Sequence, residues 1–65
     1  MPDLAPARER FLSPQELADW LGVPVKTIYH WRSGGEGPPG IRIGRHVRFA
    51  EDDVRDWIKA QREDA

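Results

Sequence analysis

Apolar side chains recur at helical spacing in three stretches of this 65-residue chain. A helical period of 3.6 residues places positions i, i+3, i+4 and i+7 on one face, which can pack against a core. The pattern therefore predicts three amphipathic helices, starting near Pro14, just after Val23 and at Glu51. Their expected inner faces are formed by Leu17, Ala18 and Leu21, then by Pro24, Ile28 and Trp31, and finally by Val54, Trp57 and Ile58.

Residues typical of helix ends separate the first two of these helices. Ser13 can cap the first helix, Pro14 suits its first position, and Glu16 completes a capping box. Gly22 stands where this helix must end, because glycine takes the left-handed cap conformation at little cost. The short gap that follows predicts a helix-turn-helix. Trp20 is expected at the edge of the buried stripe.

Residues 34–40 hold four glycines and two prolines, which predicts a loop, and residues 41–49 then alternate apolar and polar side chains. This alternation predicts a β-hairpin. A two-residue turn at Gly44-Arg45 would mix apolar and basic side chains on each face. A three-residue turn through His46 would separate an apolar face from a basic one, so we expect the second register. Its cross-strand pairs are Ile43 with Val47, Ile41 with Phe49, and Arg42 with Arg48.

The expected pairing places two arginines, Arg42 and Arg48, directly opposite each other. Like charges in this position are unfavourable, and an anionic partner would relieve the repulsion. Arg45 and His46 are expected to project from the tip of the hairpin. The alternative interpretation is a solvated hairpin whose arginines only keep it soluble.

The order of these elements predicts a fold that is mainly α with a small β-hairpin. Helix, turn, helix, loop, two-stranded wing and helix together outline a winged helix-turn-helix over residues 11–61. We expect residues 1–10 to form a flexible N-terminal arm and residues 62–65 a frayed tail. The three acidic residues Glu51, Asp52 and Asp53 suit the positive N-terminal end of the last helix dipole.

The net charge of −1 hides a polarised chain. Residues 25–48 carry five Lys and Arg against the single acid Glu36, a net +4, while the flanking segments are neutral or acidic. A small DNA-binding domain needs a basic face, not a basic total. With no cysteine and only two histidines, the chain offers no His/Cys metal cluster and no evident nucleophile–base pair. We therefore expect no enzyme activity, metal or cofactor, and a cytoplasmic location without a membrane span or signal peptide.

The second predicted helix carries a polar outer face. Lys26, Tyr29, His30 and Ser33 lie opposite its apolar face, as a helix entering a DNA major groove would need. On this helix alone, an ordinary amphipathic helix with a solvated face is an equally good interpretation.

The ordered motifs of the chain resemble a known family. They are Phe11-Leu12-Ser13, Leu17-Ala18, Leu21-Gly22-Val23, Thr27-Ile28-Tyr29, Gly37-Pro38-Pro39, Arg42-Ile43-Gly44-Arg45, Val47-Arg48-Phe49 and Val54-Trp57-Ile58. Together they resemble excisionases (recombination directionality factors) and AlpA-type proteins, which share a MerR-like winged helix-turn-helix DNA-binding domain. The chain departs from the family at Pro24, where a serine-like cap is common, and in the length of the 34–40 loop.

The resemblance implies a recognition helix in the major groove and a wing that reaches phosphates or the adjacent minor groove. The residues proposed to bind DNA are Val25, Lys26, Thr27, Tyr29, His30 and Arg32 on the helix, and Arg42, Arg45, His46 and Arg48 on the wing.

Three classes of function remain open at this point. The first is an excisionase of a phage or mobile element, which binds and bends attachment-site DNA cooperatively and promotes excision by an integrase. The alternative on the same fold is a small AlpA/MerR-like transcriptional regulator, although the chain lacks the coiled coil and effector site of MerR sensors, so no small-molecule effector is expected. A protein-interaction module, with Trp20 and the acidic last helix as its surface, is the third; an enzyme or metal protein is disfavoured. The expected partners are double-stranded DNA, an integrase and further copies of the chain on DNA.

Overall fold

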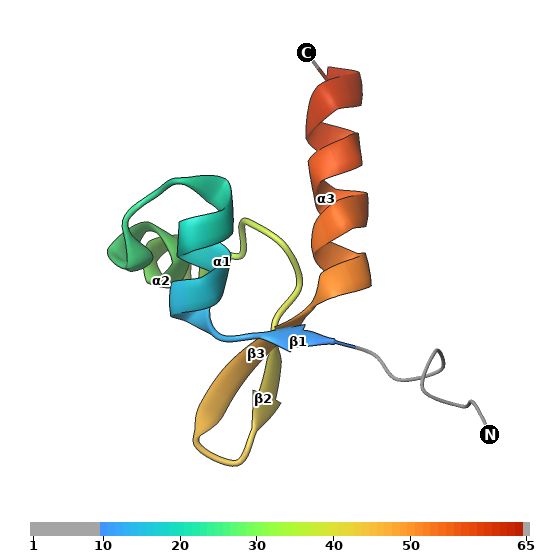
Figure 1. The fold of residues 1–65 in the computed structure, drawn as a ribbon. Coiled ribbons are helices and arrows are strands. Elements are labelled where there is room, and N and C mark those ends of the chain that lie inside the picture. Colours follow the sequence, from blue (N-terminus) through green and yellow to red (C-terminus); the bar gives the residue numbers. More distant parts are fainter. Residues whose placement is uncertain (1–9, 65) are drawn as a thin grey trace, which may run out of the picture.

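The computed structural model describes residues 10–64, which form three helices and a small three-stranded antiparallel sheet (Figure 1). The strands lie in the order β1-β3-β2, so β3 is central and pairs with β2 to form the wing. This arrangement is a winged helix-turn-helix, and it confirms the expected fold class. In chain order the elements are β1 (Phe11–Leu12), α1 (Pro14–Leu21), α2 (Val25–Ser33), β2 (Ile41–Ile43), β3 (His46–Ala50) and α3 (Glu51–Asp64).

Helix α1 starts and ends as its sequence predicts. The Glu16 backbone N–H donates to Ser13 Oγ at 3.1 Å, and the Ser13 N–H donates to the Glu16 carboxylate at 2.8 Å, which completes the capping box. At the other end, Gly22 has φ +73° and its N–H donates to the Ala18 carbonyl. The chain therefore turns sharply into α2, as the helix-turn-helix requires.

Helix α2 begins without a capping side chain. Pro24 takes the N-cap position with φ −65° and ψ 147°, and its carbonyl accepts the Thr27 N–H at 2.9 Å. The fixed φ of proline thus starts the helix at Val25 in place of a serine-like cap. At the C-terminal end, Gly35 has φ +75°, and the Glu36 N–H donates to the Trp31 carbonyl at 2.7 Å. This Schellman-type ending directs the following loop back over Trp31.

The core lies where α1, α2, β3 and the start of α3 meet. It consists of five buried side chains: Leu17, Ala18, Ile28, Phe49 and Val54. Pro38 in the loop is also buried, and a Cβ on Gly37 would lie 3.0 Å from the Trp31 ring. Because the core is so small, each of its contacts contributes a large share of the stability.

The register of the wing differs from the expected one. Ile43 pairs with His46, Arg42 with Val47, and Ile41 with Arg48, so the turn has two residues and the expected opposition of Arg42 and Arg48 is wrong. Gly44 has φ +63°, and no non-glycine residue among the described ones has a positive φ. These φ values are those of a type II′ turn, whose twist suits a hairpin.

The physical reason for this error is the exposure of β2. Ile41 and Ile43 are 40% and 49% exposed, so the hairpin has no fully buried apolar face that could select the register. A register is strongly specified only where one face is buried, and otherwise the turn determines it.

The sequence pattern did not predict the short strand β1 at the start of the domain. Phe11 pairs with Ala50 and Leu12 with Phe49. Two residues are too few to show an alternation, so β1 was expected only as the beginning of the folded part. The pairing places the start of the domain beside the junction of β3 and α3.

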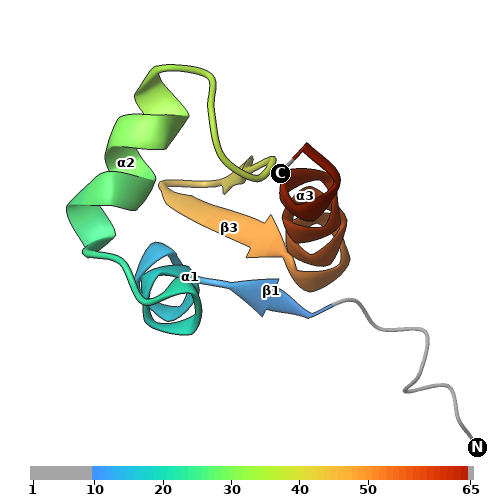
Figure 2. The ribbon, with the colours of Figure 1, turned by 90° about the horizontal axis from the view of Figure 1, so that it is seen from above.

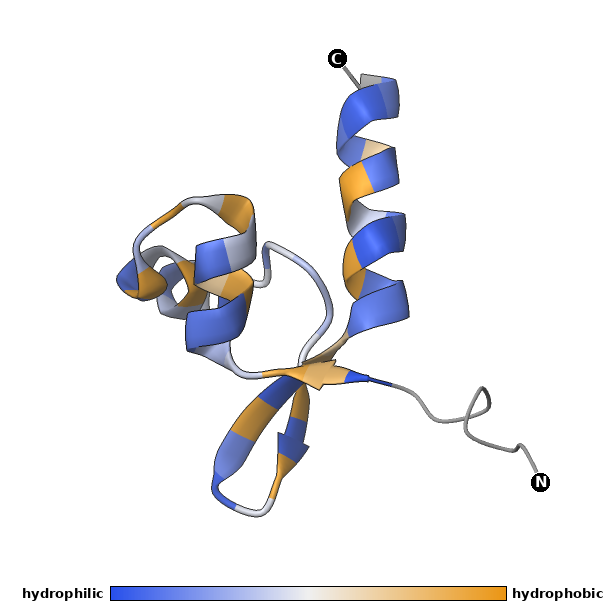
Figure 3. Cartoon of the chain, in the orientation of Figure 1, coloured by the Kyte–Doolittle hydropathy of each residue, from blue (hydrophilic) through white to orange (hydrophobic). Residues whose placement is uncertain are grey.

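Helix α3 follows β3 directly and projects away from the sheet (Figures 1 and 2). Its apolar residues lie on the side that faces α1 and α2 (Figure 3). Val54 is fully buried, but Trp57 and Ile58 are half-buried, so the expectation that all three belong to the core is correct only in part. The helix extends to Asp64, beyond the expected domain end at residue 61. Fraying of residues 62–65 stays a prediction, and the expected arm lies, apart from Arg10, outside the described residues.

Arg10 is held at the base of α3. Its carbonyl accepts the Glu51 N–H at 2.9 Å, and its Nε lies 3.6 Å from the Glu51 carboxylate. The same carboxylate accepts a hydrogen bond from Arg55 at 2.6 Å. Glu51 therefore joins the first described residue to the first turn of α3.

Candidate nucleic-acid interface

The outer face of α2 presents hydrogen-bonding side chains to solvent. Lys26 and His30 are exposed and Tyr29 is 53% exposed, because Ile28 and Trp31 turn the opposite side of the helix inward. Together with Thr27, Lys26 and His30 line a shallow depression of about 340 Å³. A helix with this surface can reach the donors and acceptors on base edges.

Two of the helix residues proposed to bind DNA are only half-exposed. Val25 packs against the core cluster, and Thr27 is half-buried. No side chain caps the start of α2. Its first backbone N–H groups can therefore donate to a phosphate oxygen, which is how Val25 can contribute although its side chain points inward.

Arg32 lies at the other end of α2, beside the entry to the wing. A Cβ built on Gly40 would lie 2.7 Å from Arg32 Nη1 and 3.0 Å from the Phe49 ring. The guanidinium therefore packs along the backbone that leads into β2. Arg32 adds its positive charge between the helix and the wing, not on the outer face of α2.

The wing places most of its basic residues in solvent. Arg42, Arg45 and His46 are exposed, and Arg45 occupies the turn. Gly44 allows this turn to be tight, so the Arg45 side chain stands at the extreme tip of the hairpin. An arginine in this position can reach a phosphate or a minor groove.

Arg48 behaves differently from the other wing arginines. It is half-buried, and its Nη1 donates to the Val47 carbonyl at 2.7 Å. Its charge also acts on Glu16 at the start of α1. The Ser13 backbone N–H, followed by the Ser13 hydroxyl, lowers the pKa of Glu16, and the charges of Arg48 and Arg10 lower it further. Arg48 is thus partly committed to contacts within the protein.

Helix α2 and the turn of the wing lie on the same side of the molecule. In both views the turn of the wing is on the α2 side, and α3 is on the opposite side (Figures 1 and 2). The structure therefore brings the helix residues and the wing residues into one composite surface. A duplex on this surface can receive α2 in its major groove while the wing follows the neighbouring backbone.

Among residues 10–64, no group of His, Cys, Asp and Glu side chains is placed to hold a metal ion. No helix within the same range has the length and apolarity needed to cross a membrane.

The sequence pattern missed the exposed isoleucines of the wing. Ile41 and Ile43 share one face of the hairpin with Arg48 and His46, because the two-residue turn shifts the register. The dipeptide Gly44-Arg45 was the signal that could have revealed this, since a glycine in the first central position is typical of a type II′ turn.

Fold and surface together define a winged helix-turn-helix DNA-binding protein. A family model described as a helix-turn-helix domain matches residues 11–62, most of the chain, and the protein belongs to this family. No curated protein matches the chain significantly.

Proposed function

We propose that this protein is an excisionase of a phage or mobile element, which binds attachment-site DNA in the cytoplasm. The observation that carries the proposal is the composite surface, on which the polar outer face of α2 and the Arg45-tipped wing lie on one side. Such a surface allows α2 to contact base edges in a major groove while the wing binds the adjacent phosphate backbone.

The structure suggests different roles for the proposed DNA-binding residues. Lys26 and His30 stand on the exposed face of α2, where they can reach base edges and contribute specificity. Arg42 and Arg45 are exposed on the wing and can bind phosphates. Arg32 and Arg48 lie closer to the protein body and add positive charge behind these contacts.

The surface that a single copy can bury against DNA is small for selective binding. Single DNA-binding modules bury roughly 600–1,000 Å² of protein surface, which limits both affinity and specificity. The basic block at residues 25–48 is followed by an acidic α3, so neighbouring copies are attracted through complementary charge. We therefore propose cooperative binding to direct repeats spaced about 10 bp apart, which places the copies on one face of the DNA.

An array of this kind can bend the duplex for an integrase. Bending a site by 40–90° costs on the order of 1–6 kcal/mol, which the added protein–DNA contacts offset. The bent array would be the structure on which the integrase assembles.

The test combines gel shift and bending assays on DNA that carries one, two or three sites. We expect cooperative binding and a bend that grows with the number of sites, and both should weaken when a half-turn is inserted between sites. Arg45→Ala should reduce binding, whereas the matched variant Arg62→Ala, which removes an exposed arginine from α3, should leave it nearly unchanged. Independent, non-bending occupation of each site would refute the excisionase role and favour the alternative, an AlpA/MerR-like transcriptional regulator.

A further inference from the structure

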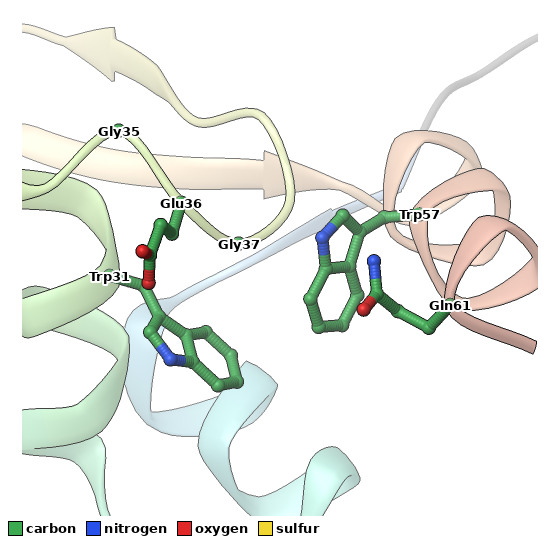
Figure 4. Close-up of a pocket in the computed structure, with 6 residues that line it drawn as sticks. All are labelled: Trp31, Gly35, Glu36, Gly37, Trp57 and Gln61. Carbon is green, nitrogen blue, oxygen red and sulfur yellow. The ribbon is translucent and has the colours of Figure 1, made fainter. Parts of the chain in front are cut away.

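A second surface lies between the helix-turn-helix and α3. Five apolar side chains line an open groove of about 460 Å³ there, with Gln61 and Arg62 at its edge: Leu21, Val23, Trp31, Trp57 and Ile58. We refer to these five residues as the tryptophan groove. Trp31 and Trp57 come from α2 and α3, their ring centroids are 5.5 Å apart, and both remain half-exposed. Figure 4 shows the two indoles side by side and tilted relative to each other, with Gln61 beside Trp57.

The two sides of the tryptophan groove differ in charge. On the α1 side, Arg55, Lys59 and Arg62 line an adjoining depression together with Trp20 and Ile58. On the loop side, the groove continues into a depression that includes Glu36 and Gln61. An occupant of the groove therefore meets cations along one flank of α3 and an acid on the far wall.

Two of these cations are available for a partner. Arg55 is already engaged, since its guanidinium binds Glu51 at 2.6 Å and lies 5.4 Å from the centre of the Trp20 ring. Among the side chains of residues 10–63, neither Lys59 nor Arg62 has an ion-pair partner, and both are exposed. Their charges stand beside apolar surface, where a partner carboxylate could reach them while its neighbours fill the groove.

We propose that the tryptophan groove docks an amphipathic helix of another protein, with acidic residues along one side of its apolar stripe. The apolar stripe would pack over the contacting Trp31 and Trp57 rings. The acidic side would face Lys59 and Arg62 and point away from Glu36. The groove lies between α2 and α3, away from the tip of the wing, so a copy bound to DNA still presents it (Figures 1 and 2). This inference goes beyond DNA binding and does not depend on it.

Two other occupants, DNA and the wing of a second copy, fit the tryptophan groove less well. DNA is disfavoured because its charged backbone offers no apolar stripe to fill a groove lined by five apolar side chains. The wing of a second copy offers Ile41 and Ile43 as apolar groups. They share their face with His46 and Arg48, so the wing would bring positive charge against Lys59 and Arg62.

The three tryptophans of the chain make the test direct. Trp31 and Trp57 line the groove and Trp20 lines its cationic flank, so the whole tryptophan emission reports on this region. The probes are two synthetic helical peptides of about four turns, with the same Leu and Phe stripe, whose polar side carries either Glu or Lys. We expect the Glu peptide to shift the emission to the blue and to bind about tenfold more tightly, because two ion pairs replace two repulsions.

Charge reversal on the flank is the decisive variant. Lys59→Glu/Arg62→Glu should reverse the preference so that the Lys peptide binds more tightly, and both positions are exposed, so the fold should be kept. The matched control Arg42→Glu/Arg45→Glu makes the same change on the wing and should retain the preference for the Glu peptide while losing DNA binding. Failure of DNA binding and failure of docking are thus read in separate assays.

Three results would overturn the proposal. The first is the absence of any emission change with either peptide, and the second is equal affinity for both peptides. The third is self-association of the free chain in sedimentation that Lys59→Glu/Arg62→Glu abolishes, which would assign the tryptophan groove to a second copy.

Discussion

Removal of the Arg45 side chain tests the wing most sharply, because the structure separates this arginine from Arg48. Arg45 stands exposed at the turn of the hairpin, whereas Arg48 is half-buried and donates to the Val47 carbonyl. Of the two, only Arg45 can bind a phosphate without losing a hydrogen bond within the protein. We therefore expect Arg45→Ala to weaken binding to every DNA sequence by a similar factor and Arg48→Ala to have a smaller effect on DNA affinity.

The magnitude follows from counterion release. Each phosphate contact contributes about −0.9 to the slope of log K against log salt, so Arg45→Ala should make this slope shallower by about 0.9. Between about 50 and about 200 mM salt, a fourfold range, the advantage of the wild type over the variant should shrink by about 3.5-fold.

Fluorescence anisotropy titrations across this salt range provide the measurement. A specific duplex and a random duplex are compared for the wild type, Arg45→Ala, Arg48→Ala and the control Arg62→Ala on α3. An unchanged slope in Arg45→Ala would exclude the wing as a phosphate contact. Equal slope changes in Arg45→Ala and Arg62→Ala would show that net charge, and not position, determines the effect.

Three further predictions follow from single positions. Lys26→Ala should weaken specific binding by about 1–3 kcal/mol and random binding less, since a base contact is lost; equal losses in gel shifts would reassign Lys26 to phosphate. Ile28→Val should lower the free energy of unfolding by about 0.5–1.5 kcal/mol in urea titrations, because Ile28 is buried, while the same change at the exposed Ile43 should have little effect; similar losses would contradict the wing geometry. The lowered pKa of Glu16 implies stability that is present above its ordinary value of 4.5 and is lost as the pH falls through the folded-state pKa. Glu16→Gln should remove this pH-dependent part of the stability. Identical profiles of unfolding free energy against pH for the wild type and the variant would show that Glu16 is not its source.

The helix boundaries could be predicted because their signals are local. Ser13 and Glu16 lie within one turn of each other, and Gly22 needs only its own backbone conformation to end α1. Such features depend little on distant contacts, so the sequence alone indicates them. The same helical period predicts that the exposed polar residues of α2 cluster on one face. Ile28 and Trp31 pack inward and so turn that face toward solvent.

The wing could not be placed in the same way. Its register was predicted from the assumption that Ile41 and Ile43 are buried, but the edge strand β2 leaves both exposed. The hairpin pattern shows that apolar side chains alternate, but it does not show whether another layer covers them. The turn chemistry of Gly44 was the stronger signal.

The partial exposure of α3 has a similar origin. Val54, Trp57 and Ile58 share one helical face, so periodicity predicts the same environment for all three. The face is covered only near its beginning, because α3 projects beyond the helices beside it (Figure 1). Position along the helix, which periodicity does not encode, decides that Val54 is buried and that Trp57 remains accessible.

The pairing of β1 with β3 also determines when the domain can fold during synthesis. Phe11 meets Ala50, so this ladder joins the first strand of the domain to the last residue before α3. A nascent chain that contains α1 and α2 still lacks Phe49 and Val54, two of the five buried side chains of the core. Long-range pairing of this kind delays folding until both partners have left the ribosome. We therefore expect the helix-turn-helix to become stable only after the wing and the first turn of α3 have emerged, so that the two elements proposed to contact DNA form in a single event.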